Sequence, residues 1–372
     1  MKKNTILISD LARLIWLHSF PGCKPLLVIS DPGMGKTTAL NHFCRQHNYD
    51  PYVFMLNQFS PVDLKGYLVP DKETRRMVSY PSAEIPWSED GRPYADTHNG
   101  RRPLILLDEF LSATTGVGHI AQQLVLERRI GEWHLPPDAL IVAAANGAAM
   151  KCGSNKITMS LADRFAIYHI RPDAKATLDW MVGNGVNHWI VAFINVQMAS
   201  GGGVLWSTPP EKWTGEEPID SARSYTALST VFASPEGKDI LTSSLLPAVC
   251  AAHIGEASGT KLAEFIRLSL SVGNIDDLIN NPDNADIPTN PSLRWSIAAC
   301  CVMRSTKTNF ANILKLAKRL TPPELAPKEG EPTAFEAFVV RSVIQTCPQI
   351  ISGNAPFLAW IKAYGEFVKS AQ

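Results

Sequence analysis

The segment LLVISDPGMGKTTALNHFCRQH, residues 26–47, decides the fold because it joins an apolar strand to a helix through a glycine-rich turn. LLVIS is a short apolar run of the kind that forms a buried strand, and KTTALNHFCRQH has the pattern of a helix. This order of strand, loop and helix is what a phosphate-binding loop requires. The usual motif is G-x-x-x-x-G-K-[ST], and Ser30 stands in the place of its first glycine.

Each part of this loop has an expected task toward a bound nucleotide. Gly33 and Gly35 let the backbone turn its amides inward, and the helix N-terminus adds a favourable dipole. Lys36 should reach the β- and γ-phosphates, and the Thr37 hydroxyl should bind Mg²⁺. Serine at position 30 is small enough for the turn but lacks the freedom of glycine at positive φ. The residues expected to hold ATP are Ser30, Asp31, Pro32, Gly33, Met34, Gly35, Lys36, Thr37 and Thr38.

The composition describes an ordinary globular protein of two or three domains. The chain has 372 residues, of which 45% are hydrophobic and 19% charged, and its 35 basic residues balance its 35 acidic ones. A neutral chain gives no reason to expect a polyanionic partner. Seven irregularly spaced cysteines indicate a reducing compartment rather than a disulfide framework. No apolar run is long enough to span a bilayer. We therefore expect a cytoplasmic protein, whose residues 1–20 form an amphipathic helix.

The pattern of apolar runs divides the chain into an α/β part and an all-α part. Up to about residue 172, short apolar runs alternate with helical patterns, which is typical of a parallel sheet covered by helices. Helical patterns fill the remainder. We expect a nucleotide-binding core over residues 1–172, a helical lid over 173–235 and a helical C-terminal region over 236–372. The expected strands are residues 26–29, 52–56, 104–107, 140–145 and 165–170.

Three further stretches carry polar residues at positions that suit nucleotide chemistry. RRPLILLDEF ends an apolar strand in Asp108 and Glu109, the Walker B arrangement, in which Asp108 holds the Mg²⁺ shell and Glu109 acts as general base. ALIVAAANG ends in Asn146, which can orient the attacking water or can simply be a turn residue. MSLADRFAIYHI places Arg164 before the last strand, where it can point toward a neighbouring subunit or be an ordinary surface cation.

Taken in order, these motifs resemble those of the AAA+ ATPases, and more narrowly of the MoxR-like and dynein-related branch. LNQFSPVDLKGYLVPD, QQLVLERRIGEWHLPPDALIVAAAN and DSARSYTAL are similar to stretches of that branch, and the last carries the sensor 2 arginine as Arg223. Good resemblance covers residues 25–235, and Ser30 and the missing proline after Asn146 depart from it. It implies an AAA+ P-loop core with a five-stranded parallel sheet, followed by an all-α lid and a helical C-terminal region.

The same resemblance implies a Mg²⁺-dependent ATPase that forms ring homo-oligomers, usually hexamers, with ATP between subunits. It implies a protein remodeller or chaperone of a bacterial or phage-infected cell, often with a von Willebrand A domain partner. Two alternatives stay open: a nucleic-acid motor or loader, which the neutral charge disfavours, and a scaffold that hydrolyses ATP poorly. Arg128 and Arg129, in LERRIGEWHLP, rival Arg164 as the charge supplied in trans. We interpret that stretch as a solvated turn rather than a pore-facing hairpin that presents Trp133.

Overall fold

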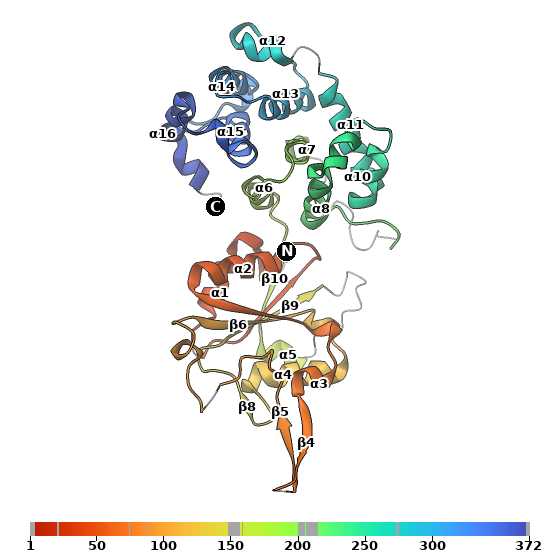
Figure 1. Cartoon of the computed structure of the whole chain (residues 1–372), viewed down its shortest axis with the longest axis vertical. Coiled ribbons are helices and arrows are strands. Elements are labelled where there is room, and N and C mark those ends of the chain that lie inside the picture. Colours follow the sequence, from red (N-terminus) through yellow and green to blue (C-terminus); the bar gives the residue numbers. More distant parts are fainter. Residues whose placement is uncertain are drawn as a thin grey trace. The chain divides into compact units, whose positions relative to one another are not determined.

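The computed structural model describes residues 4–20, 22–73, 75–88, 90–147, 157, 159–199, 205, 215–272 and 275–369. Two compact units make up the chain, Met1–Asp173 and Ala174–Gln372 (Figure 1). The expected boundary after residue 172 lies one residue before this division. Glycines 201–203, Trp206 and Trp213 of the loop expected in the lid lie outside the described residues.

The first unit is built on a six-stranded parallel sheet in the order β1-β10-β2-β9-β6-β3. Five of these strands match the expected positions to within three residues, and β1 was not expected. Their bounds are β1 Thr5–Leu7, β2 Leu26–Ser30, β3 Tyr49–Met55, β6 Arg102–Asp108, β9 Leu140–Asn146 and β10 Ala166–Arg171. The prediction of a parallel α/β core with the loop strand inside the sheet is confirmed.

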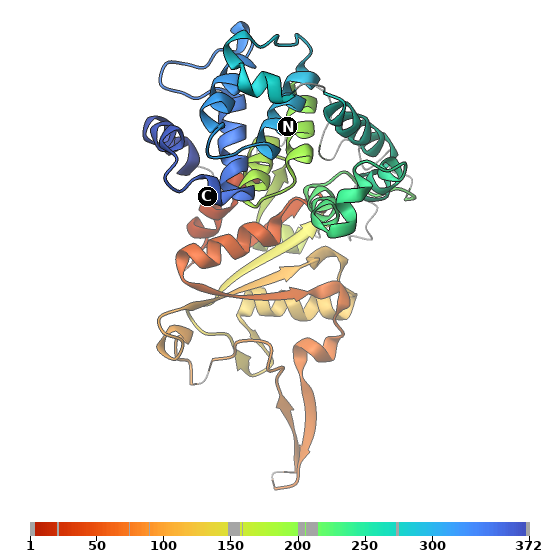
Figure 2. The ribbon, with the colours of Figure 1, turned by 45° about the horizontal axis from the view of Figure 1, so that its top comes forward.

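Helices cover both faces of this sheet because its central strands are apolar on both faces up to their polar last residues. Side chains alternate between the two faces, so Leu27, Ile105 and Ala143 share one cluster with Val117 and Leu124 of α4 (Thr115–Glu127). The opposite face is covered by α1 (Leu11–Leu17) and α2 (Lys36–His47). Figures 1 and 2 show these two helices on one side of the sheet and α4 on the other.

The N-terminal segment differs from the expected amphipathic helix. Thr5–Leu7 forms β1, which pairs in parallel with His169–Arg171 of β10, and the helix begins only at Leu11. The edge of β10 would otherwise expose a row of unpaired backbone groups. Pairing Thr5–Leu7 with this edge satisfies those groups, which makes the sheet six-stranded rather than five-stranded.

Two antiparallel hairpins extend the first unit beyond the main sheet. The first joins β4 (Tyr67–Asp71) to β5 (Arg76–Tyr80) and follows the short helix α3 (Pro61–Lys65). The second joins β7 (Arg129–Ile130) to β8 (Trp133–His134). Residues 126–136, interpreted as a solvated turn, thus form a short hairpin whose turn residues Gly131 and Glu132 are exposed, and a pore-facing position stays a hypothesis. The remaining helix of the unit is α5 (Met159–Arg164).

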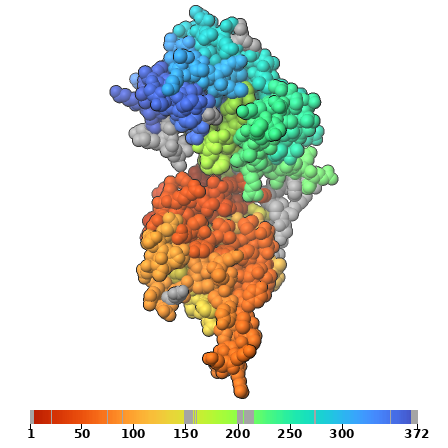
Figure 3. Space-filling view, in the orientation of Figure 1, coloured from red at the N-terminus to blue at the C-terminus, as the bar shows by residue number. Residues whose placement is uncertain are grey.

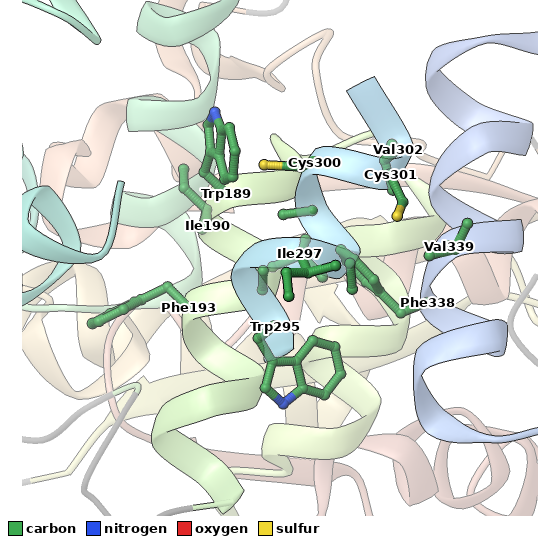
Figure 4. Close-up of a cluster of buried hydrophobic side chains, with 14 of the residues drawn as sticks. Trp189, Ile190, Phe193, Trp295, Ile297, Cys300, Cys301, Val302, Phe338 and Val339 are labelled. Atoms are coloured by element: carbon green, nitrogen blue, oxygen red, sulfur yellow. The ribbon is translucent and has the colours of Figure 1, made fainter. Parts of the chain in front are cut away.

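The second unit is helical throughout its described ranges, as its sequence predicts. One buried hydrophobic cluster joins its helices, with Trp189, Phe193, Trp295 and Phe338 among the large side chains (Figure 4). Members of this cluster come from both sides of residue 235, and the division of the unit there stays a prediction. The helices are α6 Ala174–Gly183, α7 His188–Ala199, α8 Ala222–Ala233, α9 Pro235–Ile240, α10 Leu246–Ile254, α11 Glu256–Leu270, α12 Ile275–Asn280, α13 Pro291–Met303, α14 Phe310–Arg319, α15 Ala334–Thr346 and α16 Ala355–Lys369.

Two long helical patterns of this unit each form two helices. Residues 173–197 break between α6 and α7, where Gly185 has a φ of 68° that favours glycine. Residues 293–320 break after Met303, where the Asn309 side chain bonds backbone groups of Arg304 and Thr306 in place of helical partners. Across the described ranges, no helix combines the length and the apolar character needed to cross a membrane.

We predict that His188 makes the second unit less stable below pH 6.5. Its Nε2 is buried without a hydrogen-bond partner among the described residues, and burial lowers its pKa from 6.5 to about 4. The unfolded chain therefore takes up this proton at a higher pH than the folded chain. The free energy of unfolding should fall as pH drops from 6.5 to 4, by on the order of 3 kcal/mol, and this contribution should end below pH 4.

Urea unfolding followed by tryptophan fluorescence checks this prediction at several pH values. The His188→Phe variant has a ring that cannot be protonated, so its stability should decline less steeply between pH 6.5 and 4.5 than that of the parent. Identical slopes for parent and variant would contradict the assignment.

Candidate nucleotide site

The carboxyl ends of three neighbouring strands bring the candidate site residues together. Ser30 at the end of β2 pairs with Asn146 at the end of β9, and β6 beside β9 ends at Asp108. Because parallel strands all run in one direction, their polar terminal residues lie together at the carboxyl ends of the strands. Open α/β sheets bind their ligands at this end.

The glycine-rich loop has the backbone that its sequence predicts. Gly33 and Gly35 have φ values of 73° and 82°, in the left-handed region that side chains disfavour. No atom beyond its neighbours lies within 4 Å of where a Cβ on Gly35 would stand, so its backbone angle rather than lack of space requires glycine. Gly35 is the residue before α2, whose first residue is Lys36. The loop therefore ends at a helix N-terminus, which favours anions.

Ser30 lies in an ordinary strand backbone rather than in a glycine conformation. It is buried as the last residue of β2 and is absent from the residues with positive φ. Its hydroxyl donates a 3.0 Å hydrogen bond to the backbone oxygen of Asp31. The backbone at this position therefore does not need the positive φ angles that only glycine adopts easily. The departure of Ser30 from the usual motif therefore has no backbone cost.

A chain of hydrogen bonds links the loop lysine to the candidate base. Lys36 Nζ donates to Asn146 Oδ1 at 3.1 Å and lies 3.4 Å from the Ala145 backbone oxygen. Asn146 Nδ2 donates to Glu109 Oε1 at 2.6 Å. Only one orientation of the asparagine amide satisfies both neighbours, since an ammonium needs an acceptor and a carboxylate needs a donor. Asn146 therefore touches both the phosphate-binding lysine and the general base proposed from the sequence.

Asp108 and Thr37 bring two oxygen ligands to the same place. The Thr37 hydroxyl lies 3.4 Å from Asp108 Oδ2, and Asp108 is buried. Mg²⁺ prefers oxygen ligands and is usually held by one or two protein groups together with phosphates and waters. Within the described part of the chain no cluster of three or more His, Cys, Asp or Glu side chains could hold a metal by itself. Thr37 and Asp108 thus fit an ion that a bound nucleotide helps to hold.

Ser112 is a site residue that the sequence analysis missed. Its hydroxyl donates to Glu109 Oε2 at 3.1 Å, so that both oxygens of this carboxylate have a donor. Glu109 has a left-handed backbone with φ 55°, and its amide donates to Asp108 Oδ1 at 2.9 Å. This turn carries the chain from β6 into a short 3-10 helix that presents Ser112 three residues later. The hydroxyl at that spacing was the only sequence signal.

The remaining loop residues and Arg223 differ in how far their side chains are buried. Burial raises the pKa of Asp31, and the nearby charge of Lys36 offsets part of the rise. Met34 is buried, whereas Thr38 is exposed on the first turn of α2. Arg223 is exposed on α8 in the second unit.

The three arginines considered for a role in trans differ in their contacts. Arg164 is exposed at the end of α5, and no hydrogen bond or ion pair of its side chain is present among the described residues. Arg128 Nη2 donates to the backbone oxygens of Pro136 and Ala139 at 2.9 and 2.7 Å, and burial lowers its pKa. Arg129 pairs with Glu127 at 2.7 Å. Arg128 therefore holds its own loop together, and Arg164 is the freest of the three.

The described chain has the architecture that the sequence resemblance implies. The loop strand lies inside a parallel sheet, the strand that ends in Asp108 lies two places away, and a helical region follows. A parallel sheet with the glycine-rich loop inside it and a helical region after it is the fold of a P-loop nucleotide-binding core.

Comparisons with known proteins add only remote likenesses. No protein-family model and no curated protein matches the sequence. A presumed ATPase from Cytophaga hutchinsonii is similar in structure at 12% identity and a TM-score of 0.34, over 85% of this chain and 77% of that chain. A single-site mutant of RuvB from Thermotoga maritima is similar at 12% identity and a TM-score of 0.34, over 78% and 80%. Likenesses this remote carry no argument, and the fold rests on the sheet and the loop.

We predict that restoring glycine at position 30 will not improve nucleotide binding. The Ser30→Gly variant gains a backbone freedom that the strand does not use and loses the hydroxyl contact to Asp31. Its affinity for Mg²⁺·ATP, measured by isothermal titration calorimetry, should stay within about threefold of that of the parent. A gain of tenfold or more would show that serine damages the loop and would favour a decayed site.

Proposed function

We propose that this chain is a Mg²⁺-dependent ATPase that binds ATP at the carboxyl edge of its sheet. The observation that carries the proposal is the contact of Asn146 with both Lys36, where it is buried, and Glu109, where it is partly buried. An ATPase must both neutralise the charge of the phosphates and activate the attacking water. Asn146 contacts the side chain suited to each task, Lys36 for the phosphates and Glu109 for the water. A bare phosphate-binding loop would not need the second contact.

The geometry supports a division of tasks among the residues of this chain. Lys36 would bind the β- and γ-phosphates. Its ammonium group would then have to give up its hydrogen bond to Asn146 in favour of phosphate oxygens. Thr37 and Asp108 would hold Mg²⁺, which when bound supplies charge that neutralises the phosphate oxygens. Glu109 would accept a proton from the attacking water, while Asn146 orients that water. Ser112 would keep the Glu109 carboxylate turned toward the site.

The finer role that we propose follows the sequence resemblance. The chain would assemble as a ring, hexameric in the related proteins, and would remodel a protein client with a von Willebrand A domain protein as adaptor. Arg164 would complete the site of the neighbouring subunit, which is supported by its exposure and by the engagement of Arg128 and Arg129 elsewhere. Arg223 would sense the nucleotide from the helical unit.

We predict that one of three single variants fails in ATP binding and that the other two bind ATP but fail in its hydrolysis. Lys36→Ala should abolish ATP binding because it removes the positive charge that would contact the β- and γ-phosphates. Glu109→Gln should bind ATP normally and hydrolyse it at least ~100-fold more slowly, the scale expected for losing a positioned base. Arg164→Ala should bind ATP with near-native affinity and lose ~10³–10⁵ in rate. Calorimetry and phosphate release separate the two effects.

Mixing two inactive variants tests whether the site is shared. A subunit with Glu109→Gln keeps Arg164 and can lend it to a neighbour that carries Arg164→Ala and an intact Glu109. Mixed rings should therefore regain part of the activity, whereas each variant alone stays inactive. Ring size, measured by mass photometry, is the control for assembly. Mixed rings of normal size without any recovery would exclude Arg164 and turn attention to Arg129.

We predict that nucleic acid does not stimulate the ATPase. The net charge is zero, and a motor on DNA or RNA would rely on phosphate contacts whose strength falls steeply with salt. The rate of phosphate release should stay within about 1.5-fold when single- or double-stranded DNA or RNA is added at 50 mM salt. A severalfold increase at 50 mM that disappears at 200 mM salt would instead support the nucleic-acid motor.

A further inference from the structure

The hairpin formed by β4, β5 and the turn between them carries a concentration of exposed apolar side chains. Figure 3 shows it as a finger of the first unit. Six large apolar residues within fourteen positions are exposed: Tyr67 (68%), Leu68 (58%), Val69 (43%), Met77 (57%), Val78 (37%) and Tyr80 (60%). Scattered exposed apolar residues are ordinary, but a contiguous group of them marks an interaction site.

Both faces of the hairpin are apolar. The register pairs Tyr67 with Tyr80 and Val69 with Val78, and directly opposite residues lie on the same face. The other face carries Leu68, Pro70 and Met77, together with Ser79 opposite Leu68. A sheet that packs on a core has one apolar and one polar face. The hairpin therefore lacks the pattern of a strand pair that covers its own domain.

The base of the hairpin is built to hold it in place. α3 begins with a capping box in which the Ser60 amide and the Asp63 side chain bond at 2.7 Å. Gly66 follows with φ 79°, and a Cβ there would stand 2.0 Å from the Tyr80 backbone oxygen. Only glycine allows the two strands to approach this closely. The hairpin thus leaves the domain at a fixed point.

The exposed area is large enough to be costly without a partner. An aromatic side chain buries 150–250 Å² when covered, so Tyr67 and Tyr80 alone expose on the order of 250 Å². Exposed apolar strands are also templates for aggregation unless something covers them. β5 contains no proline, whereas Pro70 on β4 lacks the N–H that pairing needs. The free edge of β5 is accordingly the better one for an added strand.

The charges and backbone of the hairpin select the kind of partner. Residues 71–76 carry a net charge of +1, because Lys72, Arg75 and Arg76 outnumber Asp71 and Glu73, and Asp71 lies directly opposite Arg76. A lipid bilayer is a poor partner, since the edges of a two-stranded ribbon would leave backbone groups unsatisfied in hydrocarbon. A second copy of the hairpin would bring the same positive charge. An extended polypeptide satisfies the edge, covers apolar side chains and can supply acidic groups to the turn.

We propose that the hairpin binds an extended segment of another protein as a third strand along β5. The bound segment is apolar along the strand and acidic at the end that reaches the turn. It enters antiparallel to β5, so that its C-terminal end lies beside Arg76. The inference rests on the proposed function in one respect, namely that the bound segment belongs to the client of the ATPase. Binding of the segment itself requires no ATP.

Fluorescence anisotropy with synthetic peptides tests the proposal without nucleotide. The first probe is fluorescein-Gly-Thr-Val-Ile-Val-Thr-Glu-Glu. A second probe ends in Lys-Lys instead, and a third is the first with N-methyl groups on alternate amides, which block strand pairing. The parent chain should bind the first probe, bind the second at least fivefold more weakly, and show no saturable binding of the third. The difference between the first two should shrink as salt rises.

Matched variants assign the binding to the hairpin. Tyr67→Thr with Tyr80→Thr keeps residues that suit strands and removes the aromatic area, so affinity should fall at least tenfold. The control is Leu17→Thr with Phe20→Thr, which alters two residues of similar exposure, 56% and 55%, elsewhere in the same unit. Lys72→Glu with Arg76→Glu should reverse the preference between the acidic and basic probes. This reversal is informative even if the tyrosine variant unfolds, which thermal unfolding would reveal.

Each other outcome would overturn the proposal. Absence of saturable binding by the parent, equal binding of the N-methylated probe, or equal weakening by the control variant would each contradict an added strand. Hairpin-dependent self-association in sedimentation without peptide binding would assign the surface to a second copy, and hairpin-dependent binding to anionic vesicles would assign it to lipid. If peptide binding holds while ATP hydrolysis is absent, only the proposed enzymatic function fails.

Discussion

The hydrogen bonds that join Lys36, Asn146 and Glu109 are the interaction on which the site depends. An ammonium and a carboxylate that both lie at a partly buried edge cost desolvation energy unless polar neighbours compensate. Asn146 compensates both at once, since its amide accepts from one and donates to the other. An anion that draws Lys36 away would leave Asn146 Oδ1 without this donor, while Asn146 Nδ2 still faces Glu109. Asn146 would thereby couple the proposed general base, Glu109, to phosphate binding at Lys36.

The fold creates this contact from the ends of strands that are distant in sequence. β2, β6 and β9 end within one layer because all three run in the same direction, and their apolar bodies are buried on both faces. The sheet fixes the backbone at Ser30, Asp108 and Asn146. The glycine-rich loop and the turn after β6 place the other site residues. Gly33, Gly35 and Glu109 all have left-handed φ values, so the polar edge is also where unusual backbone conformation concentrates.

The sequence could predict the fold and most of the site because both depend on local patterns. Five apolar runs and the residues that end them, Asp108 and Asn146 among them, were readable from periodicity. Ser112 and β1 were not, because each depends on a partner that is known only after the chain folds: the Glu109 carboxylate for one and the edge of β10 for the other. The β4–β5 hairpin was also missed, because its apolar residues are exposed and so do not follow the alternation that a core imposes.

A structure of the Glu109→Gln variant with ATP and Mg²⁺ would show whether the nucleotide takes over Lys36, because the substitution should slow hydrolysis while glutamine keeps the size and shape of glutamate. We expect the γ-phosphate to lie against Lys36, Thr37 and Asp108 to face the ion, and Lys36 to have moved from Asn146 toward the phosphate. A structure in which the nucleotide binds elsewhere, or in which the contact between Lys36 and Asn146 remains at 3.1 Å with ATP bound, would contradict this expectation.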